Sequence, residues 1–267
     1  MTEWHSICRR AVDDVRRVLT EMPDPADRSR IVGTGKGGDE TSAIDEAAER
    51  VVVARLEAEA GDFTLVSEEL GIRPARDGSE TYVVVDPIDG SINAKRAIPF
   101  FSVSIAVAYG PAMRDVWFGY VFDLGSGEEW YAYRGNGAER TGAARVAVVP
   151  RERIELLSME ATRTDLVARH APDLAPIAHR VRVMGSLALS LCHVADGRMD
   201  AVCSLKPARS VDVAAAQLVL SEAGGYVDLI DGGSLADAPL DLEGRSRIVG
   251  AATRDLYQQI VAALGPL

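Results

Sequence analysis

Hydrophobic residues recur with a helical period in two stretches near the start of the chain. Within residues 3–21, the apolar side chains that fall roughly on one helical face are those of Ile7, Val12, Val15, Val18 and Leu19. The same spacing predicts a second helix over residues 42–59, and Gly61 is expected to end it. A loop and a glycine-rich stretch, IVGTGKGGDET at 31–41, separate the two predicted helices.

The next part of the chain carries the alternating pattern of β-strands. The segment FSVSIAVAY at 101–109 alternates large and small residues, as a packed strand does. The segments VWFGYVF at 116–122 and EWYAY at 129–133 are expected beside it in antiparallel hairpins. Two shorter strands are expected at 63–67 and 81–86, so this half of the chain contains a β-meander.

After about residue 150 the pattern changes to short strands that alternate with helices. The strands are expected at 154–159, 181–184, 199–203, 225–230 and 247–252. The helices are expected at 186–196, 212–223 and 254–264. A meander followed by alternating elements predicts an α/β fold, built as a layered α+β sandwich. We expect two packed parts, an N-terminal α+β subdomain at 1–148 and a C-terminal α/β subdomain at 149–267.

Composition and charge narrow the classes of protein to which the chain can belong. With 267 residues, of which 47% are hydrophobic, it can bury a substantial core. The net charge of −11 argues against a nucleic-acid partner. No apolar run approaches the roughly 20 residues that cross a bilayer, and the polar start MTEWHSICRR does not resemble a secretory signal. Three scattered cysteines indicate neither disulfides nor a zinc site, so we expect a cytoplasmic protein.

The segment TYVVVDPIDGSIN at 81–93 carries the clearest chemical signal. An apolar run ends at Asp86, and a second acid, Asp89, follows after a stiffening proline. Paired carboxylates suit Mg²⁺, and the backbone N–H groups of Gly90 and Ser91 could hold an anion beside it. Taken alone, the segment fits an ordinary acid-rich turn equally well.

Further acids lie in positions that have plain structural explanations. Glu68 and Glu69 follow a predicted strand, where a solvated loop is the ordinary expectation. Asp212 begins a predicted helix and fits a helix cap. Asp45 follows Ser42 at the spacing of a capping box, with Asp in place of the usual Glu.

Together, these motifs resemble those of the inositol monophosphatase family, which comprises lithium-sensitive, Mg²⁺-dependent phosphatases. The chain has SEE at 67–69, DPIDGS at 86–91 and VDVAAAQLVLSEAGG at 211–225, in the order that the family shows. The resemblance implies the alternating α and β layers of inositol monophosphatases and fructose-1,6-bisphosphatases. It also implies a hydrolase of small phosphate esters that takes part in carbohydrate metabolism and forms a homodimer.

The resemblance also implies individual roles. The expected metal ligands are Glu68, Asp86, Asp89, Asp212 and the backbone carbonyl of Ile88. They would hold two or three Mg²⁺ ions, for which Mn²⁺ could substitute and which Li⁺ could inhibit. Glu68, Asp45 and Ser91 would be catalytic, with Asp45 and the Ser91 hydroxyl orienting the attacking water. Two such ions can activate a water molecule and stabilise the leaving oxygen in line.

Other segments bear on the substrate. GTGKGGDETSAIDEAAE resembles the archaeal-type subgroup, whose members often hydrolyse both inositol monophosphate and fructose 1,6-bisphosphate. The expected substrate contacts are Gly90, Ser91, Gly185, Ser186, Leu187, Lys206 and Arg209. Lys206 and Arg209 suit a second phosphate, although ordinary solvated surface explains them as well. Lys36 and Asp39 would belong to a mobile catalytic loop, whose glycines permit motion and disorder equally.

Two alternative functions remain open. The chain could be a 3′-phosphoadenosine 5′-phosphate phosphatase or a histidinol-phosphatase of the same family. Those groups tend to carry a lysine directly after D-G-T, whereas Ile92 and Asn93 follow Ser91 here, which disfavours both. A non-catalytic homologue that binds phosphorylated ligands would be indicated by the loss of a metal ligand, yet every expected carboxylate is present.

Overall fold

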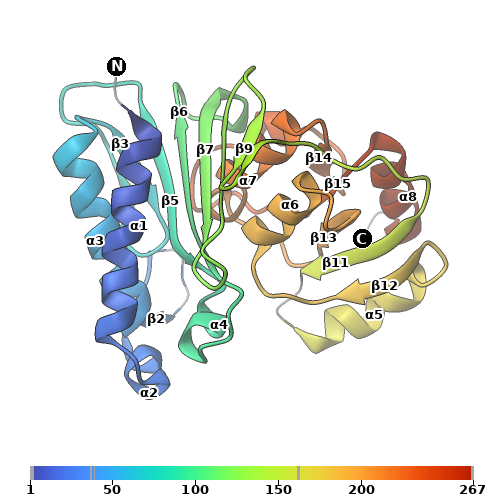
Figure 1. Cartoon of the computed structure of the whole chain (residues 1–267), viewed down its shortest axis with the longest axis horizontal. Helices are drawn as coiled ribbons and strands as arrows, with labels where there is room; N and C mark the ends of the chain where they lie inside the picture. Colours follow the sequence, from blue (N-terminus) through green and yellow to red (C-terminus); the bar gives the residue numbers. More distant parts are fainter. Residues whose placement is uncertain (1–2, 37, 39, 161–162, 266–267) are drawn as a thin grey trace.

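The chain folds into alternating layers of helices and sheets (Figure 1). The computed structural model describes residues 3–36, 38, 40–160 and 163–265. Across the molecule, the layers are a helix pair, an eight-stranded sheet, a second helix pair, a five-stranded sheet and a third helix pair. This arrangement confirms the layered α/β fold expected from the sequence.

Helices α1 (Trp4–Glu21) and α3 (Ala43–Glu59) form the first layer, as the hydrophobic pattern predicts. The side chains that α1 buries against the sheet and α3 include those of Trp4, Ile7, Val12 and Val15. Between the two helices, a short helix α2 (Pro25–Ser29) precedes an antiparallel hairpin of β1 (Ile31–Thr34) and β2 (Glu40–Ser42). The sequence predicted a loop here, because β1 is exposed along its whole length and has no apolar face.

The first sheet has the strand order β10-β9-β8-β7-β6-β5-β3-β4. Its strands are β3 (Thr64–Ser67), β4 (Gly71–Arg73), β5 (Tyr82–Asp89), β6 (Ser102–Ala108), β7 (Val116–Asp123), β8 (Glu129–Tyr133), β9 (Ala138–Arg140) and β10 (Ala143–Val146). The antiparallel meander β6-β7-β8 is confirmed. Strand β5 continues to Asp89, three residues further than expected, because Asp89 pairs with Ser102 beyond an irregularity in the register.

The second sheet has the strand order β12-β11-β13-β15-β14. Its strands are β11 (Ile154–Glu160), β12 (Ala178–Arg182), β13 (Ala201–Ser204), β14 (Tyr226–Leu229) and β15 (Ile248–Ala251). Strand β12 lies at the edge and begins three residues before the predicted 181–184. Four of its five residues are exposed, so no alternating apolar pattern marked its position.

The remaining helices fill the other layers. They are α4 (Ser91–Lys95), α5 (Thr164–Leu174), α6 (Leu187–Ala195), α7 (Ser210–Glu222) and α8 (Arg254–Leu264). Helices α6 and α7 lie between the two sheets and are buried on almost every side, which explains their nearly continuous apolar sequence. At Gly119 of β7, an added Cβ would lie 2.5 Å from the carbonyl oxygen of Ala215 in α7. This glycine therefore lets the helix pack closely on the first sheet.

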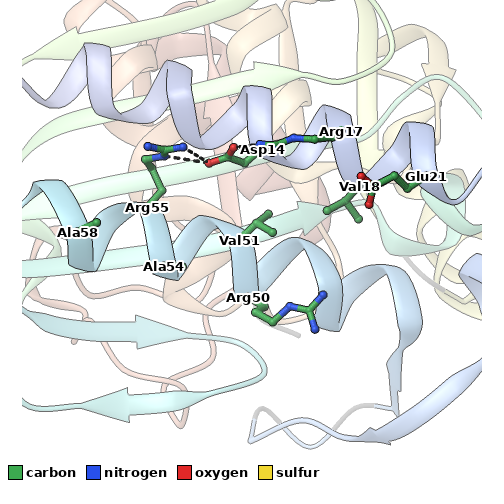
Figure 2. Close-up of a pocket in the computed structure, with 9 residues that line it drawn as sticks. All are labelled: Asp14, Arg17, Val18, Glu21, Arg50, Val51, Ala54, Arg55 and Ala58. Carbon is green, nitrogen blue, oxygen red and sulfur yellow. Dashed lines mark hydrogen bonds and ion pairs between the residues drawn. The ribbon is translucent and has the colours of Figure 1, made fainter.

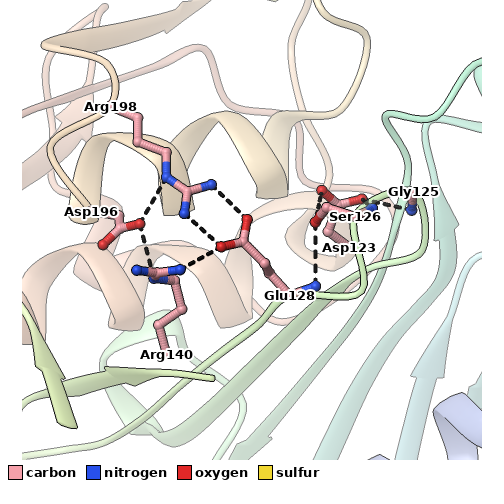
Figure 3. Close-up of polar contacts among 7 residues, drawn as sticks. All are labelled: Asp123, Gly125, Ser126, Glu128, Arg140, Asp196 and Arg198. Carbon is pink, nitrogen blue, oxygen red and sulfur yellow. Dashed lines mark hydrogen bonds and ion pairs between the residues drawn. The ribbon is translucent and has the colours of Figure 1, made fainter. Parts of the chain in front are cut away.

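An ion-pair network ties the first sheet to the end of α6 (Figure 3). Glu128 pairs with Arg140 of β9 and with Arg198, 2.6 Å away. Asp196 lies 3.1 Å from Arg140 and 2.9 Å from Arg198. The Arg198 guanidinium also lies 5.6 Å from the centre of the Trp130 ring. These contacts join residues of the expected N-terminal part, 1–148, to residues of the expected C-terminal part, 149–267.

The strands of the two sheets divide between residues 146 and 154, close to the expected boundary. One hydrophobic cluster nevertheless spans both sheets, and it includes Val84 of the first and Val202 of the second. The division into subdomains at 1–148 and 149–267 therefore stays a prediction. None of the helices in the described residues has the length and apolar content needed to cross a membrane.

Candidate active site

Three acids far apart in the sequence meet at one edge of the first sheet. Glu68 follows β3, Asp86 lies in β5 and Asp212 lies in the first turn of α7. Strands β3 and β5 are parallel neighbours, so their carboxyl ends bring Glu68 and Asp86 together. Each of the three side chains offers an oxygen atom that lies within 4.8 Å of the other two. The structure therefore brings together three of the four carboxylates predicted as metal ligands.

The electrostatics of this group suit a bound cation. Burial raises the pKa of Asp86, which is 2% exposed, and the charges of Glu68, Asp89 and Asp212 raise it further. Burial also raises the pKa of Glu68 to about 8. Such neighbouring carboxylates repel one another unless a positive charge offsets them. Because the donors are all oxygen atoms, the group fits a hard divalent ion such as Mg²⁺.

Asp89, the fourth predicted carboxylate, lies at the end of β5 and outside that close group. Its Oδ2 accepts hydrogen bonds from the Ser186 hydroxyl, at 2.5 Å, and from the backbone N–H of Ala188, at 2.8 Å. Burial, and then the charge of Asp212, raise its pKa to about 7. Asp89 thus connects the sheet edge to the start of α6, and its role as a metal ligand stays a prediction.

The Gly90–Ser91 turn is fixed by close backbone packing. Gly90 has a φ of +98°, and an added Cβ would lie 3.0 Å from the carbonyl oxygen of Gly185. Glycine is therefore required both by conformation and by space. The Ser91 hydroxyl donates a hydrogen bond of 3.1 Å to the carbonyl oxygen of Ile88, the carbonyl predicted to bind metal. The turn also places Gly90 against the expected substrate loop at 185–187.

Asp45 combines a capping role with an oxygen that has no hydrogen-bond partner. Its Oδ2 accepts from the backbone N–H of Ser42, at 3.2 Å, and from the Ser42 hydroxyl, at 2.5 Å. Lys95 lies 3.5 Å from the same oxygen. Within the described residues, the buried Oδ1 accepts no hydrogen bond, and none joins Asp45 to Ser91. The expected acid–hydroxyl pair is thus not in direct contact.

The glycine-rich hairpin lies beside the acidic pair. The Thr41 hydroxyl donates to the Glu69 carboxylate, and the backbone N–H of Lys36 donates to the Glu69 carbonyl at 3.2 Å. The Lys36 side chain lies against Gly71, where an added Cβ would be 3.0 Å from the lysine Cγ. Asp39, the other residue assigned to this loop, lies outside the described residues.

The two basic residues expected to bind a second phosphate have different environments. Lys206 is exposed, as a solvated residue would be. Arg209 is only 7% exposed, so solvated surface is the wrong description for it. Its Nη2 lies 2.5 Å from Glu68 Oε1, and its Nε lies 3.8 Å from Asp212 Oδ1. Arg209 therefore contacts two of the three clustered acids.

Asp212 lies at the start of α7 and within the group of three acids. Helix α7 begins at Ser210, two residues earlier than predicted, so Asp212 lies in its first turn rather than at the cap position. Its Oδ2 accepts from the backbone N–H of Arg209 at 2.8 Å. Its carboxylate also belongs to the group of three acids.

Sequence reasoning missed two buried acids that support the site. Glu49 accepts hydrogen bonds from the Ser67 hydroxyl and from the backbone N–H groups of Glu69 and Leu70, so it holds the turn that carries Glu68. Glu49 follows Asp45 by one helical turn, and this spacing could have indicated that both acids lie on the same face of the helix. Glu160 accepts from the backbone N–H of Gly185, at 2.9 Å, and its other partners are the hydroxyls of Ser158 and Ser190.

A separate cavity of about 330 Å³ lies between α1 and α3 (Figure 2). Among its lining residues, Arg55 pairs with Asp14 at 2.8 Å. None of the residues predicted for the active site lines it. We therefore assign no part of the chemistry to this cavity.

Comparisons with known proteins place the chain in a family. The sequence profile of the inositol monophosphatase family matches residues 5–266. A fructose-1,6-bisphosphatase/inositol-1-monophosphatase from Archaeoglobus fulgidus is 36% identical over 258 residues, which cover 96% of this chain and 95% of that protein. A bifunctional NADP phosphatase/NAD kinase from Methanocaldococcus jannaschii is 26% identical over an alignment 294 positions long. This alignment covers 98% of this chain and 50% of that protein. The crystal structure of an inositol monophosphatase–fructose 1,6-bisphosphatase has a TM-score of 0.87 and 28% identity, covering 98% of this chain and 100% of that one.

Proposed function

This chain belongs to the inositol monophosphatase family and is a phosphoric monoester hydrolase, and we propose that it hydrolyses fructose 1,6-bisphosphate and inositol 1-phosphate with Mg²⁺. The observation that carries this proposal is the group formed by Glu68, Asp86 and Asp212, whose oxygens lie within 4.8 Å of one another. An all-oxygen donor set favours Mg²⁺, with Mn²⁺ as a substitute. Li⁺ is then expected to inhibit, as the family resemblance implies.

The ligands proposed for the ions come from both halves of the chain. Glu68, Asp86 and the carbonyl of Ile88 would hold one ion, and Asp86 with Asp89 and Asp212 a second. A third would be held more loosely near Glu68. Four carboxylates and a phosphate dianion carry a charge that three divalent ions would balance. Bound there, Mg²⁺ would lower the pKa of a water molecule and offset the charge that develops on the phosphate.

The protein groups would position the reactants. The backbone N–H groups of Gly90 and Ser91 are proposed to hold the phosphate oxygens beside the acids. The buried Oδ1 of Asp45 can accept a hydrogen bond from the attacking water, and the Ser91 hydroxyl would orient the same water. Phosphate monoester hydrolysis depends mainly on such positioning and on charge stabilisation. Asp45 and Ser91 are therefore proposed as catalytic residues, together with Glu68.

Substrate choice is proposed to depend on residues beyond the acids. The segment Gly185, Ser186 and Leu187 adjoins Gly90 and would contact the sugar or polyol. Lys206 and Arg209 would bind the second phosphate of fructose 1,6-bisphosphate. Lys36 and Asp39 would approach the phosphate from the glycine-rich hairpin.

A nucleotide phosphatase is the second candidate, because one relative is named as an NADP phosphatase. The residue that follows Ser91 is Ile92, rather than the lysine typical of the nucleotide-directed groups. Asn93 has a structural role, since its side-chain amide donates hydrogen bonds to the carbonyls of Phe100 and Met184, both at 2.8 Å. These observations favour a sugar or polyol phosphate.

The test is the release of inorganic phosphate by the purified protein in excess Mg²⁺. The panel comprises fructose 1,6-bisphosphate, inositol 1-phosphate, NADP and 3′-phosphoadenosine 5′-phosphate. We expect the highest kcat/KM for one of the first two substrates. A clearly higher kcat/KM for NADP or 3′-phosphoadenosine 5′-phosphate would support the nucleotide phosphatase instead. Release from no substrate would support the non-catalytic alternative.

We further propose that the protein acts as a cytoplasmic homodimer, as the family resemblance implies. Light scattering on the purified protein measures its mass in solution. A mass close to twice that of one chain, 28.6 kDa, is expected. A monomer mass across the micromolar range would contradict the dimer without affecting the proposed chemistry.

A further inference from the structure

Arg209 places a positive charge inside the group of acids. Its Nη2 lies 2.5 Å from Glu68 Oε1, and its Nε lies 3.8 Å from Asp212 Oδ1. The guanidinium lowers the pKa of both Glu68 and Asp86, against the larger effect of burial, which raises them. One arginine thus acts on every member of the group, so it serves as a counter-ion to the whole cluster.

The burial of Arg209 shows how strongly it depends on these acids. A guanidinium that is only 7% exposed must be compensated by opposite charge, because removing it from water is costly. The three carboxylates together carry up to three negative charges, and the arginine supplies one positive charge. A divalent ion at the same acids would compensate them more fully than Arg209 does.

Arg209 and a metal ion at these acids would both draw on the charge of the Glu68 carboxylate. A Mg²⁺ ion binds carboxylate oxygens at roughly 2.0–2.1 Å. Glu68 Oε1 already lies 2.5 Å from the arginine nitrogen. An ion bound to the Glu68 carboxylate would bring a second positive charge close to the guanidinium, and the repulsion between the two cations favours movement of the arginine away from the ion.

The backbone and the side chain of Arg209 are held differently. The backbone N–H is anchored to Asp212 Oδ2 at 2.8 Å, directly before α7 begins. The side chain is long and flexible, so its guanidinium can leave Glu68 while the backbone stays in place. The acids therefore need not rearrange when the arginine moves.

We propose that Arg209 is an exchangeable counter-ion of the metal site: its guanidinium and a divalent metal ion compete for Glu68, and metal binding displaces the side chain. This inference rests on the proposed metal site. Displacement also frees the guanidinium at the moment when the site becomes ready for an anionic substrate. Occupancy by metal and recognition of phosphate by Arg209 are thereby coupled.

The test is the affinity for Mn²⁺ alone, measured by titration calorimetry on protein stripped with EDTA and dialysed. Arg209→Gln removes the competing charge, so Mn²⁺ should bind about tenfold more tightly than to the wild type. Lys206→Gln is the matched control. Lys206 lies three residues before Arg209 and is exposed, so the substitution removes the same charge without touching the acids. Its affinity should stay within about twofold of the wild type.

The possible results distinguish a failure of the Arg209 exchange from a failure of the proposed metal site. An unchanged or weaker affinity in Arg209→Gln would contradict the exchange, as would an equal gain in Lys206→Gln. The absence of Mn²⁺ binding in all three proteins would contradict the metal site itself, and the inference with it.

A second measurement distinguishes exchange from a purely structural role. In EDTA, Arg209→Gln should melt at a lower temperature than the wild type, because the three clustered acids lose this counter-ion. Mn²⁺ should then raise its melting temperature by more than it raises that of the wild type. An equal shift in both would contradict the inference. If Arg209→Gln does not fold, Arg209→Lys keeps the charge without the planar fork and should gain a smaller part of the affinity.

Discussion

At the scale of single residues, the acids proposed for the site also make structural hydrogen bonds. Asp45 accepts two hydrogen bonds from Ser42 through one oxygen and keeps the other without a partner in the described residues. Asp212 accepts the backbone N–H of Arg209 and also joins the three-acid group. A contact that caps a helix is therefore compatible with the proposed metal-ligand role of the same carboxylate.

Asp212→Asn tests this division of roles. We expect kcat to fall by about 100-fold or more, because a neutral amide replaces a charged ligand. The free energy of unfolding should fall by only about 1 kcal/mol, because the amide oxygen can still accept the N–H of Arg209. Phosphate release and urea unfolding measure the two effects. Asp255→Asn is the control, since Asp255 is an exposed acid in the first turn of α8. Near-normal kcat in Asp212→Asn would contradict its assignment.

At the scale of elements, the sequence predicted those whose burial is one-sided or strongly patterned. Helices α1 and α3 and the meander β6-β7-β8 have clear periodicity, and they appear where expected. The hairpin of β1 and β2 and the edge strand β12 are largely exposed, so their sequences carry little pattern. These elements are held by pairing and by tertiary contacts, which a local pattern does not record.

The same limit explains which site residues could be found. Acids inside recognisable motifs, such as Asp86 and Asp212, were predicted. Glu160 has partners at Gly185 and Ser190, far along the chain, so only the fold reveals its role. The contact of Arg209 with Glu68 likewise joins two segments that the sequence separates by the whole first sheet.

Glu160→Ala tests whether this buried acid holds the loop beside Gly90. Its loss leaves one backbone N–H and two serine hydroxyls without their acceptor, so unfolding should become easier by about 2–3 kcal/mol. Urea denaturation measures the change. Glu155→Ala is the matched control, because Glu155 lies on the same strand but is exposed and pairs with Arg180 at 3.4 Å. Equal, small effects in both variants would contradict the positioning role of Glu160.

At the scale of the whole molecule, the grouping of the three acids depends on how α7 packs against the first sheet. Asp86 and Glu68 come from the first sheet, whereas Asp212 comes from a helix between the sheets. Asp89 contacts the start of α6, and the Glu128–Arg198 network contacts the region where α6 ends. Contacts at both of its ends therefore hold α6 against the first sheet.

The Glu128 network should make stability depend on pH. Its hydrogen bond with Arg198 is the largest cause that lowers the pKa of Glu128 to about 2. A lowered pKa in the folded state contributes stability above the unfolded value of about 4.3, and this contribution is lost as pH falls toward 2. Melting temperatures between pH 6 and 3 should fall less steeply for Glu128→Gln than for the wild type. Identical slopes would show that the network does not contribute to stability.

The clustered carboxylates are proposed to bind the metal that phosphate-ester hydrolysis requires. The most direct measurement is phosphate release from fructose 1,6-bisphosphate as a function of Mg²⁺ concentration, for the wild type and for folded Asp86→Asn. Activity should saturate with Mg²⁺, disappear in EDTA and fall by about 100-fold or more in the variant. Activity that persists in EDTA, or that Asp86→Asn retains at the wild-type level, would contradict this proposal.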